Sequence, residues 1–163
     1  SLEHTIAGWH QKEAALIFGG AYLANLTTLQ TIGRHMPDLV FISDERNHAS
    51  IIEGIRSSGN PKNIFRHNDI KHLEEILYSL PVTQPKIIIF ESVYSMNGSI
   101  GPAKEIIRLA KQYNALTYRS RLQFAPPRKK AFSLFNSNRH IVLQYMAWYN
   151  TYVACLMLPV LHL

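Results

Sequence analysis

The chain has 163 residues, a formal net charge of +6 and a pI near 9.6. This length suits one ordinary domain with a core, and the apolar fraction of 47% and charged fraction of 17% are those of a globular protein, which disfavours two compact domains. A single cysteine, Cys155, excludes an internal disulfide and fits a reducing compartment.

Segments with helical period alternate with short apolar runs as far as residue 118. In chain order we predict helix 1–14, strand 15–18, helix 21–35, strand 39–43, helix 48–59, strand 63–67, helix 70–80, strand 86–92, helix 102–114 and a strand that starts at 115. The run KIIIFES (86–92) is continuous and β-branched, which is typical of a strand buried on both faces. This alternation predicts an α/β fold with a mostly parallel sheet and helices on both faces.

The composition changes between Tyr118 and Arg119. All eleven acidic residues precede this point, whereas the excess of positive charge lies after it. The basic residues of this segment are Arg119, Arg121, Arg128, Lys129, Lys130 and Arg139. Because the excess is confined to one segment, we do not interpret the high pI as a nucleic-acid-binding face. No helical or strand period holds beyond a few residues there, so we predict an irregular, poorly packed tail over 119–163.

The run 141–161 is apolar enough to raise the question of a membrane span. A span needs roughly twenty predominantly apolar residues. Gln144, Asn150, Thr151 and Pro159 interrupt this run, so we disfavour a membrane anchor. The chain opens with Ser1 in a helical pattern and shows no secretory signal, and we expect it to be part of a longer protein.

Polar residues after the strands are the first candidates for a site, because ligands of parallel α/β folds bind at the carboxyl ends of the strands. Gly19, Gly20, Ala21 and Tyr22 lie between the first apolar run and a helix. Small residues there let backbone N–H groups at a helix N-terminus face an anion such as a phosphate. Taken alone, the motif fits a tight strand-to-helix turn better.

The segment SDERNHAS (43–50) places Asp44, Asn47 and His48 just past a strand. His48 could stack on a flat ring or relay a proton. A histidine that caps or supports the next helix is an equally good interpretation of this segment alone.

The segment FESVYSMNG (90–98) follows the most buried predicted strand and places Glu91, Ser92, Tyr94 and Ser95 together. An ordinary polar loop is a weaker interpretation here, because buried hydroxyl groups need partners. For Lys62, Arg66 and the neighbouring His67, by contrast, solvated surface charge is the default expectation.

Four segments together are more specific than any one of them. SDERNHASIIEGIRSSG, KNIFRHNDIKHLEEIL, KIIIFESVYSMNGSI and AKQYNALTY resemble the α-oxoamine synthase family of fold-type-I pyridoxal-phosphate (PLP) enzymes, in its 5-aminolevulinate synthase branch. The resemblance covers residues 1–118. It implies a partial large domain of such an enzyme, with PLP as the cofactor.

The resemblance implies cofactor contacts at Ala21, Tyr22, His48 and Ser95. Ala21 and Tyr22 occupy the family's phosphate turn, where Ala21 replaces a glycine. His48 matches the histidine that stacks on the pyridine ring, and Ser95 matches a serine that bonds the cofactor near its phenolic oxygen. Substrate contacts are implied at Ser43 and at Lys62, the latter toward the anionic acyl-CoA, and supporting roles at Asn25 and Glu91.

The resemblance ends where the family's catalytic groups are expected. It predicts an aspartate at 120, which pairs with the pyridinium nitrogen, and a histidine at 123, but this chain has Ser120 and Gln123. The lysine that binds the cofactor covalently is also unmatched, since Lys129 and Lys130 lie in a different context. We therefore expect no catalytic residue in this chain, and a tail produced by a reading-frame shift or a mis-joined gene.

The expected parent reaction condenses glycine with succinyl-CoA to 5-aminolevulinate, CoA and CO2, for tetrapyrrole and heme synthesis. The resemblance also implies a homodimer, located in the cytoplasm of a bacterium or the mitochondrial matrix of a eukaryote. The chain itself is expected to be an inactive fragment. The alternatives are a non-catalytic dimerisation or regulatory fragment, another α-oxoamine synthase, or a basic protein that binds a membrane or nucleic acid; we expect no nucleic-acid or membrane partner, and no metal.

Overall fold

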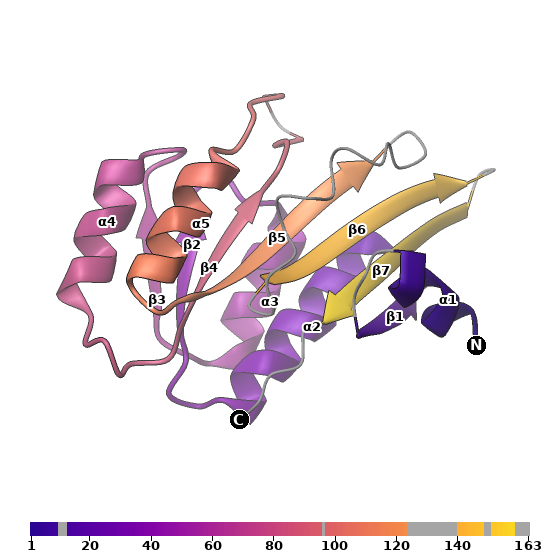
Figure 1. Ribbon diagram of the computed structural model, residues 1–163, viewed down its shortest axis with the longest axis horizontal. Coiled ribbons are helices and arrows are strands. Elements are labelled where there is room, and N and C mark those ends of the chain that lie inside the picture. Colours follow the sequence, from indigo (N-terminus) through magenta and orange to yellow (C-terminus); the bar gives the residue numbers. More distant parts are fainter. Residues whose placement is uncertain (10–12, 96, 124–139, 149–150, 159–163) are drawn as a thin grey trace.

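A computed structural model describes residues 1–9, 13–95, 97–123, 140–148 and 151–158 (Figure 1). Its strands form one sheet of seven, and helices pack on both faces. The helices are α1 (Leu2–Trp9), α2 (Ala21–His35), α3 (Ala49–Ser58), α4 (Ile70–Ser79) and α5 (Ala103–Gln112). The strands are β1 (Ala14–Phe18), β2 (Val40–Asp44), β3 (Lys62–Phe65), β4 (Lys86–Glu91), β5 (Leu116–Gln123), β6 (His140–Trp148) and β7 (Thr151–Leu158).

The sheet is mostly parallel. Its strand order is β1-β7-β6-β5-β4-β2-β3. The pairs β6–β5, β5–β4, β4–β2 and β2–β3 are all parallel. Only β7 runs against its neighbours β6 and β1. The predicted fold class is therefore confirmed, and the carboxyl ends of β2, β3, β4 and β5 lie at one edge.

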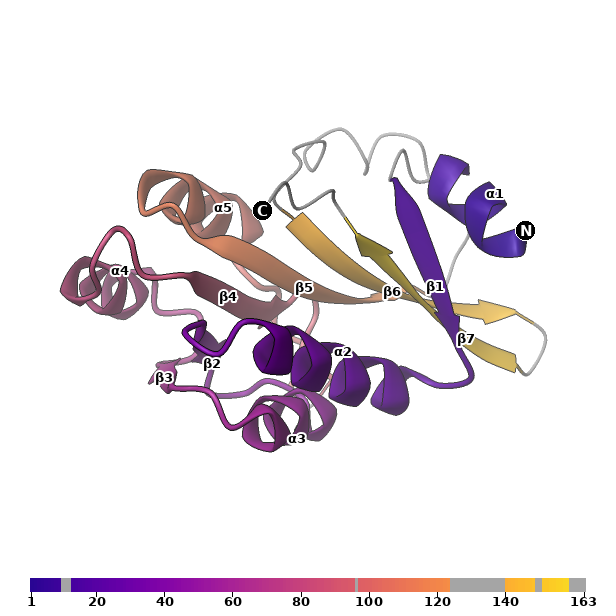
Figure 2. The same cartoon turned by 90° about the horizontal axis from the view of Figure 1, so that it is seen from below.

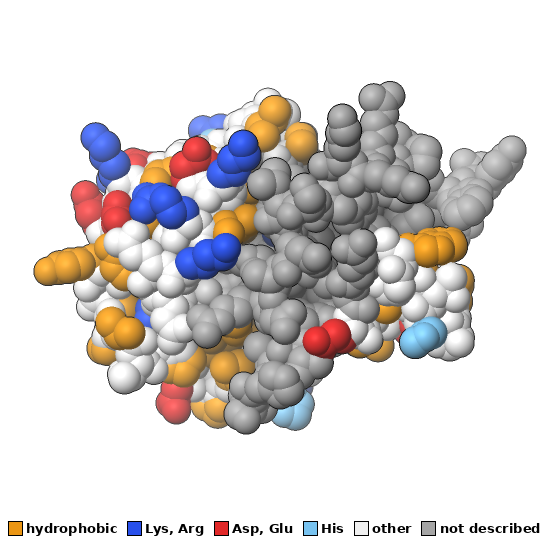
Figure 3. Space-filling model, in the orientation of Figure 1, with side chains coloured by type: hydrophobic (Ala, Val, Ile, Leu, Met, Phe, Trp, Pro, Cys, Tyr) orange, Lys and Arg blue, Asp and Glu red, His pale blue; other side chains and the backbone are white. Residues whose placement is uncertain are grey.

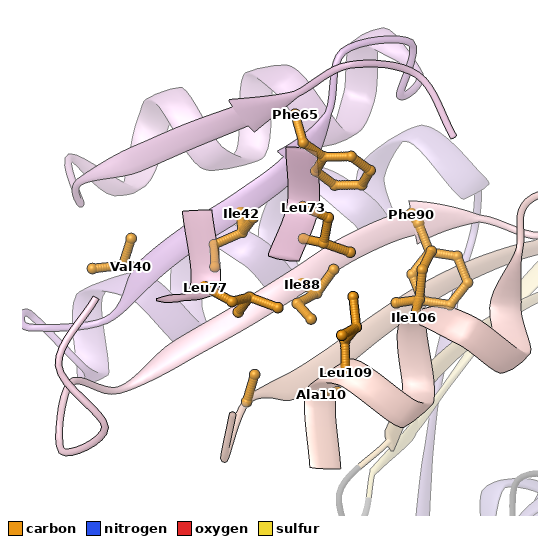
Figure 4. Packing of buried hydrophobic residues seen from close by; sticks show 11 residues of the cluster. Val40, Ile42, Phe65, Leu73, Leu77, Ile88, Phe90, Ile106, Leu109 and Ala110 are labelled. Carbon is orange, nitrogen blue, oxygen red and sulfur yellow. The ribbon is translucent and has the colours of Figure 1, made fainter. Parts of the chain in front are cut away.

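Alternating side chains of the central strands divide the core into two layers. Ile87 and Ile89 of β4 pack toward α2 and α3, whereas Ile88 and Phe90 pack toward α4 and α5. The second layer includes Leu73 from α4, which is fully buried (Figure 4). Figure 2 shows α2 and α3 on one side of the sheet and α4 and α5 on the other. A strand buried on both faces needs apolar residues at every position, which explains the continuous run of β4.

Short-range signals fix the helix ends that matter for the site. The His48 side chain caps α3 and accepts a hydrogen bond from the Ser50 backbone N–H. Gly59 ends α3 in the left-handed region at φ 80°, a conformation that glycine adopts at little cost. The Asp69 carboxylate caps α4 by accepting from the His72 N–H at 3.0 Å.

The expectation of irregular structure throughout residues 119–163 was wrong. Strand β5 continues past Tyr118 to Gln123, and β6 and β7 form strands where we expected irregular structure. Strand β6 pairs with β5 and strand β7 pairs with β1 through backbone hydrogen bonds. Such pairing does not require that polar and apolar residues alternate along the strand. The first apolar run forms the predicted strand, and this β1 lies at the far edge of the sheet, where it pairs with β7. Among the described residues, no helix is long and apolar enough to span a membrane.

Figure 3 shows one face of the molecule with its charged side chains. Over the described part of this face, lysine and arginine side chains are interspersed with acidic ones (Figure 3). The basic cluster Arg128, Lys129 and Lys130 lies outside the described residues, so its placement stays untested.

Candidate cofactor-binding site

The N-terminus of α2 is open. Gly20 precedes the helix in an extended conformation, and no described side chain caps its first turn. A Cβ atom added at Gly19 or Gly20 would meet no atom within 4 Å. Ala21 and Tyr22, the predicted phosphate turn, are the first two residues of the helix. Free N–H groups and the helix dipole make such a terminus suited to an anion.

Two aromatic rings meet beside this terminus. The ring of Tyr22 lies edge-on to the ring of His48, with centroids 6.2 Å apart and an angle of 79° between the planes. Both residues are exposed. They come from the first turn of α2 and from the N-cap of α3, so two helix N-termini and two rings face the same region.

Glu91 holds the cap of α3 in place. This residue ends β4, and its Oε1 accepts a hydrogen bond from the backbone N–H of His48 at 2.6 Å. Burial raises the pKa of Glu91 to about 7, the hydrogen bond from His48 opposes that shift, and the charge of Asp44 adds to it. Glu91 thus holds the backbone of His48, and its supporting role in a cofactor site stays a prediction.

Ser43 and Asn47 form a buried support beneath the same loop. The Asn47 side-chain amide donates to Ser43 Oγ and to the Ile89 carbonyl, both at 2.9 Å. The Ser43 hydroxyl donates to the carbonyl of Asp44 at 3.2 Å. Ser43 is 5% exposed, so its contacts here are structural, and its contact with a substrate stays a prediction.

A buried chain of polar groups runs from β5 to His48. The Tyr118 hydroxyl donates to Asn25 Oδ1 at 2.8 Å, and Asn25 Nδ2 donates to Ser50 Oγ at 2.8 Å. Ser50 Oγ lies 2.8 Å from His48 Nδ1. Sequence reasoning selected Asn25 and His48 but missed Ser50 and Tyr118. The one sequence signal for Ser50 and Tyr118 was that each carries a hydroxyl group at a position that the helix or strand pattern places in the core.

A second polar cluster lies on the α4 and α5 side of the sheet. His67 Nδ1 is 2.9 Å from Asp44 Oδ1, and His67 Nε2 is 2.8 Å from Ser99 Oγ. Tyr94 packs its ring edge-on to His67, with centroids 4.5 Å apart. The side chain of His67 is only 13% exposed. Our expectation of a solvated charge was therefore wrong for His67, because a buried carboxylate lies within reach of its ring.

Three other positions singled out in the sequence lie on β3, after β4 and on β5. Lys62 begins β3 and pairs with Phe41, so it lies toward the amino ends of the strands, away from His48. Ser95 is exposed in the loop after β4, near the carboxyl edge. Ser120 is buried in β5 and pairs with Glu91, so the position where the family pattern predicts aspartate lies beside the carboxyl end of β4.

The family model for aminotransferase class I and II matches residues 1–119. The 5-aminolevulinate synthase of Rickettsia bellii is 56% identical over 117 residues, which are 72% of this chain and 28% of that protein. The mitochondrial 5-aminolevulinate synthase of Schizosaccharomyces pombe is also 56% identical over 72% of this chain, and 21% of that protein is covered. The chain thus spans about a quarter of the length of these relatives, and the predicted resemblance is confirmed over this segment.

Solved structures match over a longer stretch. Serine palmitoyltransferase of S. paucimobilis with a bound PLP–myriocin aldimine is 26% identical with a TM-score of 0.84, over 98% of this chain and 42% of that chain. The 8-amino-7-oxononanoate synthase of Francisella tularensis shares the fold, with a TM-score of 0.72 over 96% of this chain and 46% of that one. The predicted fold type and the PLP dependence of the family are confirmed. The chain belongs to the aminotransferase class I and II family, as a fragment of the fold-type-I PLP-enzyme architecture.

Proposed function

We propose that this chain is the cofactor-binding part of the large domain of a 5-aminolevulinate synthase, and that it binds PLP without carrying out the reaction. One observation carries the proposal: the rings of Tyr22 and His48 lie 6.2 Å apart beside the uncapped N-terminus of α2. An aromatic pair next to an anion-binding helix end suits a planar ring that bears a phosphate. The identity to 5-aminolevulinate synthases supports this choice of ligand.

The described residues fit the binding of PLP. The first N–H groups of α2, at Ala21 and Tyr22, would hold the phosphate, and the His48 ring would stack on the pyridine. Glu91 keeps His48 oriented through its 2.6 Å hydrogen bond. When bound, PLP supplies an electron sink for a carbanion formed from an amino acid. Ser95, in the exposed loop after β4, is proposed as a further contact.

The described residues do not fit the activation of PLP. Position 120 carries a buried serine, and a hydroxyl group cannot supply the negative charge that keeps a pyridine nitrogen protonated. Lys62 and Lys86 begin β3 and β4, at the edge opposite to His48. We therefore assign no catalytic residue to the described part of the chain.

For the whole protein we propose the condensation of glycine with succinyl-CoA to 5-aminolevulinate, CoA and CO2. The names of the relatives support this choice. Ser43 and Lys62 are the proposed substrate contacts. The location would be the cytoplasm in a bacterium and the mitochondrial matrix in a eukaryote. We further propose that the sequence of residues 119–163 is foreign to the family; the end of the family match at residue 119 supports this.

A second copy of the chain is the proposed partner. Several large apolar side chains near the N-terminus are exposed, among them Leu2 at 63%, Trp9 at 62% and Leu23 at 51%. Exposed apolar groups of this size favour a protein contact. They also favour the second candidate function, a non-catalytic dimerisation fragment, in which the chain would associate but would not bind PLP.

The proposal is tested by titrating the purified chain with PLP and following its visible absorption and fluorescence. We expect saturable binding that His48→Ala weakens at least tenfold and that His35→Ala leaves unchanged, because His35 is exposed at the far end of α2. After borohydride reduction, peptide mapping should find no stoichiometric pyridoxyl-lysine, and an assay with glycine and succinyl-CoA should release no CoA. Turnover would contradict the proposal that the fragment is inactive. A dimer that does not bind PLP would establish the second candidate function, a non-catalytic dimerisation fragment.

A further inference from the structure

We infer that His48 is the tautomer that carries its proton on Nε2, fixed by the backbone N–H of Ser50 and supported by a one-way chain of hydrogen bonds from Tyr118 through Asn25 to the Ser50 hydroxyl. Ser50, Asn25 and Tyr118 are then positioning residues whose side chains support this tautomer. All three are fully buried, with no exposed surface on Asn25, Ser50 or Tyr118. A buried polar group without a partner is costly, so each bond of the chain has a defined direction.

The backbone N–H of Ser50 sets the direction of these hydrogen bonds. The N–H of Ser50 lies 3.2 Å from His48 Nδ1 and donates to it, as the cap of α3. A backbone N–H can only donate, so Nδ1 presents a lone pair. A neutral imidazole with a lone pair on Nδ1 has its proton on Nε2.

The side chains agree with this direction. Asn25 Nδ2 donates to Ser50 Oγ at 2.8 Å, so the Ser50 hydroxyl uses its own hydrogen toward His48 Nδ1, also at 2.8 Å. At the other end, Tyr118 donates to Asn25 Oδ1 at 2.8 Å. Every donor along the chain therefore points toward His48.

If all these hydrogen bonds ran in the opposite direction, the backbone N–H of Ser50 would have no acceptor. If the amide of Asn25 were turned round, its oxygen would accept from the Ser50 hydroxyl, and His48 Nδ1–H would donate to Ser50 Oγ. The N–H of Ser50 would then face another N–H at 3.2 Å. This clash of two donors leaves the first direction as the one that satisfies all groups.

The consequence is a hydrogen-bond donor, Nε2–H, on an exposed side chain. Glu91 and Tyr22 also contact His48, but Glu91 accepts from the backbone N–H and Tyr22 meets the ring edge-on. Nε2–H is thus the polar ring atom left for a ligand. It would be matched by an acceptor oxygen on the molecule that stacks there, a role that rests on the proposed function, whereas the tautomer itself does not.

The test is ¹⁵N NMR of the imidazole groups in the full chain without ligand, at pH 8, where free imidazole is neutral. His48 is assigned by the signal that His48→Asn removes. We expect its Nδ1 to resonate as an unprotonated ring nitrogen and its Nε2 as a protonated one. A protonated Nδ1 would overturn the inference, and since no ligand is present this failure would leave the proposal of PLP binding standing.

Asn25→Asp should reverse the direction of these hydrogen bonds without a change in side-chain size. A carboxylate has no donor, so the Ser50 hydroxyl turns toward it and offers a lone pair to His48. We expect the Nδ1-protonated form to rise from undetected to a measurable fraction. Tyr118→Phe keeps the direction and should keep the tautomer, and Asn63→Asp, which adds the same charge on β3, should also leave it unchanged. A folded Asn25→Asp protein with an unchanged tautomer would refute the role of Asn25 in supporting it.

Ser50→Ala covers the case in which Asn25→Asp does not fold. It removes the hydroxyl but keeps the backbone N–H, so Nδ1 should stay unprotonated. Its ¹⁵N resonance should move toward that of a nitrogen with weaker hydrogen bonding. An unmoved resonance would show that the hydroxyl does not donate to Nδ1, against the inference.

Discussion

His67 Nδ1 lies 2.9 Å from Oδ1 of Asp44, which joins the end of β2 to the loop between β3 and α4. The other ring nitrogen of His67 lies 2.8 Å from Ser99 Oγ in the loop after β4. The Asn68 side chain adds a bond to the carbonyl of Ile100 at 3.3 Å. One partly buried histidine thus joins three connections at the carboxyl edge, including the loop that carries Ser95.

Replacing His67 with glutamine should loosen this loop. Glutamine cannot reach both Asp44 and Ser99 in the same geometry, so at least one buried hydrogen bond is lost. We expect the free energy of unfolding to fall by about 1–3 kcal/mol. Amide exchange around Ser99 should also become faster. His35→Gln, at an exposed position, is the matched control. Equal stability of the two variants would contradict the role of His67.

Glu91→Gln should remove a pH dependence of stability. The Glu91 carboxyl has an ordinary pKa of 4.5 and a pKa of about 7 in the fold, so the folded chain binds more protons than the unfolded chain between these values. The free energy of unfolding therefore falls as pH rises from 4.5 through 7. Glutamine keeps an acceptor for the His48 N–H but cannot ionise.

At pH 8 we expect Glu91→Gln to be more stable than the parent by about 1–3 kcal/mol, and at pH 4.5 nearly equal to it. Urea unfolding at both pH values provides the measurement. Glu75→Gln, an exposed position on α4, is the control and should show no such difference. The same gap between Glu91→Gln and the parent at both pH values would refute ionisation as the cause.

Lys86→Met should destabilise the turn before β4. The Lys86 ammonium donates to the carbonyls of Pro81 and Gln84 at 2.9 Å and of Val82 at 3.4 Å, while the residue is only 2% exposed. Burial lowers the pKa of Lys86. Methionine fills similar space but leaves the carbonyls without this donor, so the free energy of unfolding should fall by about 1–3 kcal/mol.

The control for this change is Lys104→Met, in the exposed first turn of α5. Its effect should stay within about 0.5 kcal/mol. Thermal or urea unfolding of both variants decides the matter. A Lys86→Met chain as stable as Lys104→Met would mean that water serves the three carbonyls equally well.

Gly101→Ala should disturb the loop after β4, whereas Gly8→Ala should not. A Cβ atom at Gly101 would collide with the backbone carbonyl oxygen of Glu91, and backbone cannot move aside as a flexible side chain can. At Gly8, within α1, an added Cβ meets nothing within 4 Å. We expect Gly101→Ala to lose about 1–3 kcal/mol of stability. Gly8→Ala should gain up to about 1 kcal/mol, since alanine favours helix. Calorimetry of both variants checks the contrast.

Much of the central fold could be predicted from local patterns. The helix 21–35 has the predicted bounds, and Gly59 ends α3 as its type suggested. The apolar run of β4 identified a strand buried on both faces. Such signals act within a few residues, so the sequence alone is enough to show them.

Longer-range features could not be predicted. Nothing in the run 15–18 shows that β1 pairs with a strand near the other end of the chain. The burial of His67 depends on Asp44, which lies in a different strand connection and becomes its neighbour only in the fold. The position of Lys62 at the amino end of β3 likewise follows from the direction of that strand in the sheet, which the sequence alone does not show.

Strand β1 spans Ala14–Phe18, and its partner β7 spans Thr151–Leu158, so two strands that lie far apart in the sequence pair with each other. During synthesis β2 and β4 can pair and be covered by α3 and α4, while β1 has no neighbour to join. Contacts between segments so distant in sequence form slowly. Until they form, the unpaired edge of the strand is exposed to other chains. The order of translation therefore sets a vulnerable interval for the β1 edge, which lasts until β7 has emerged.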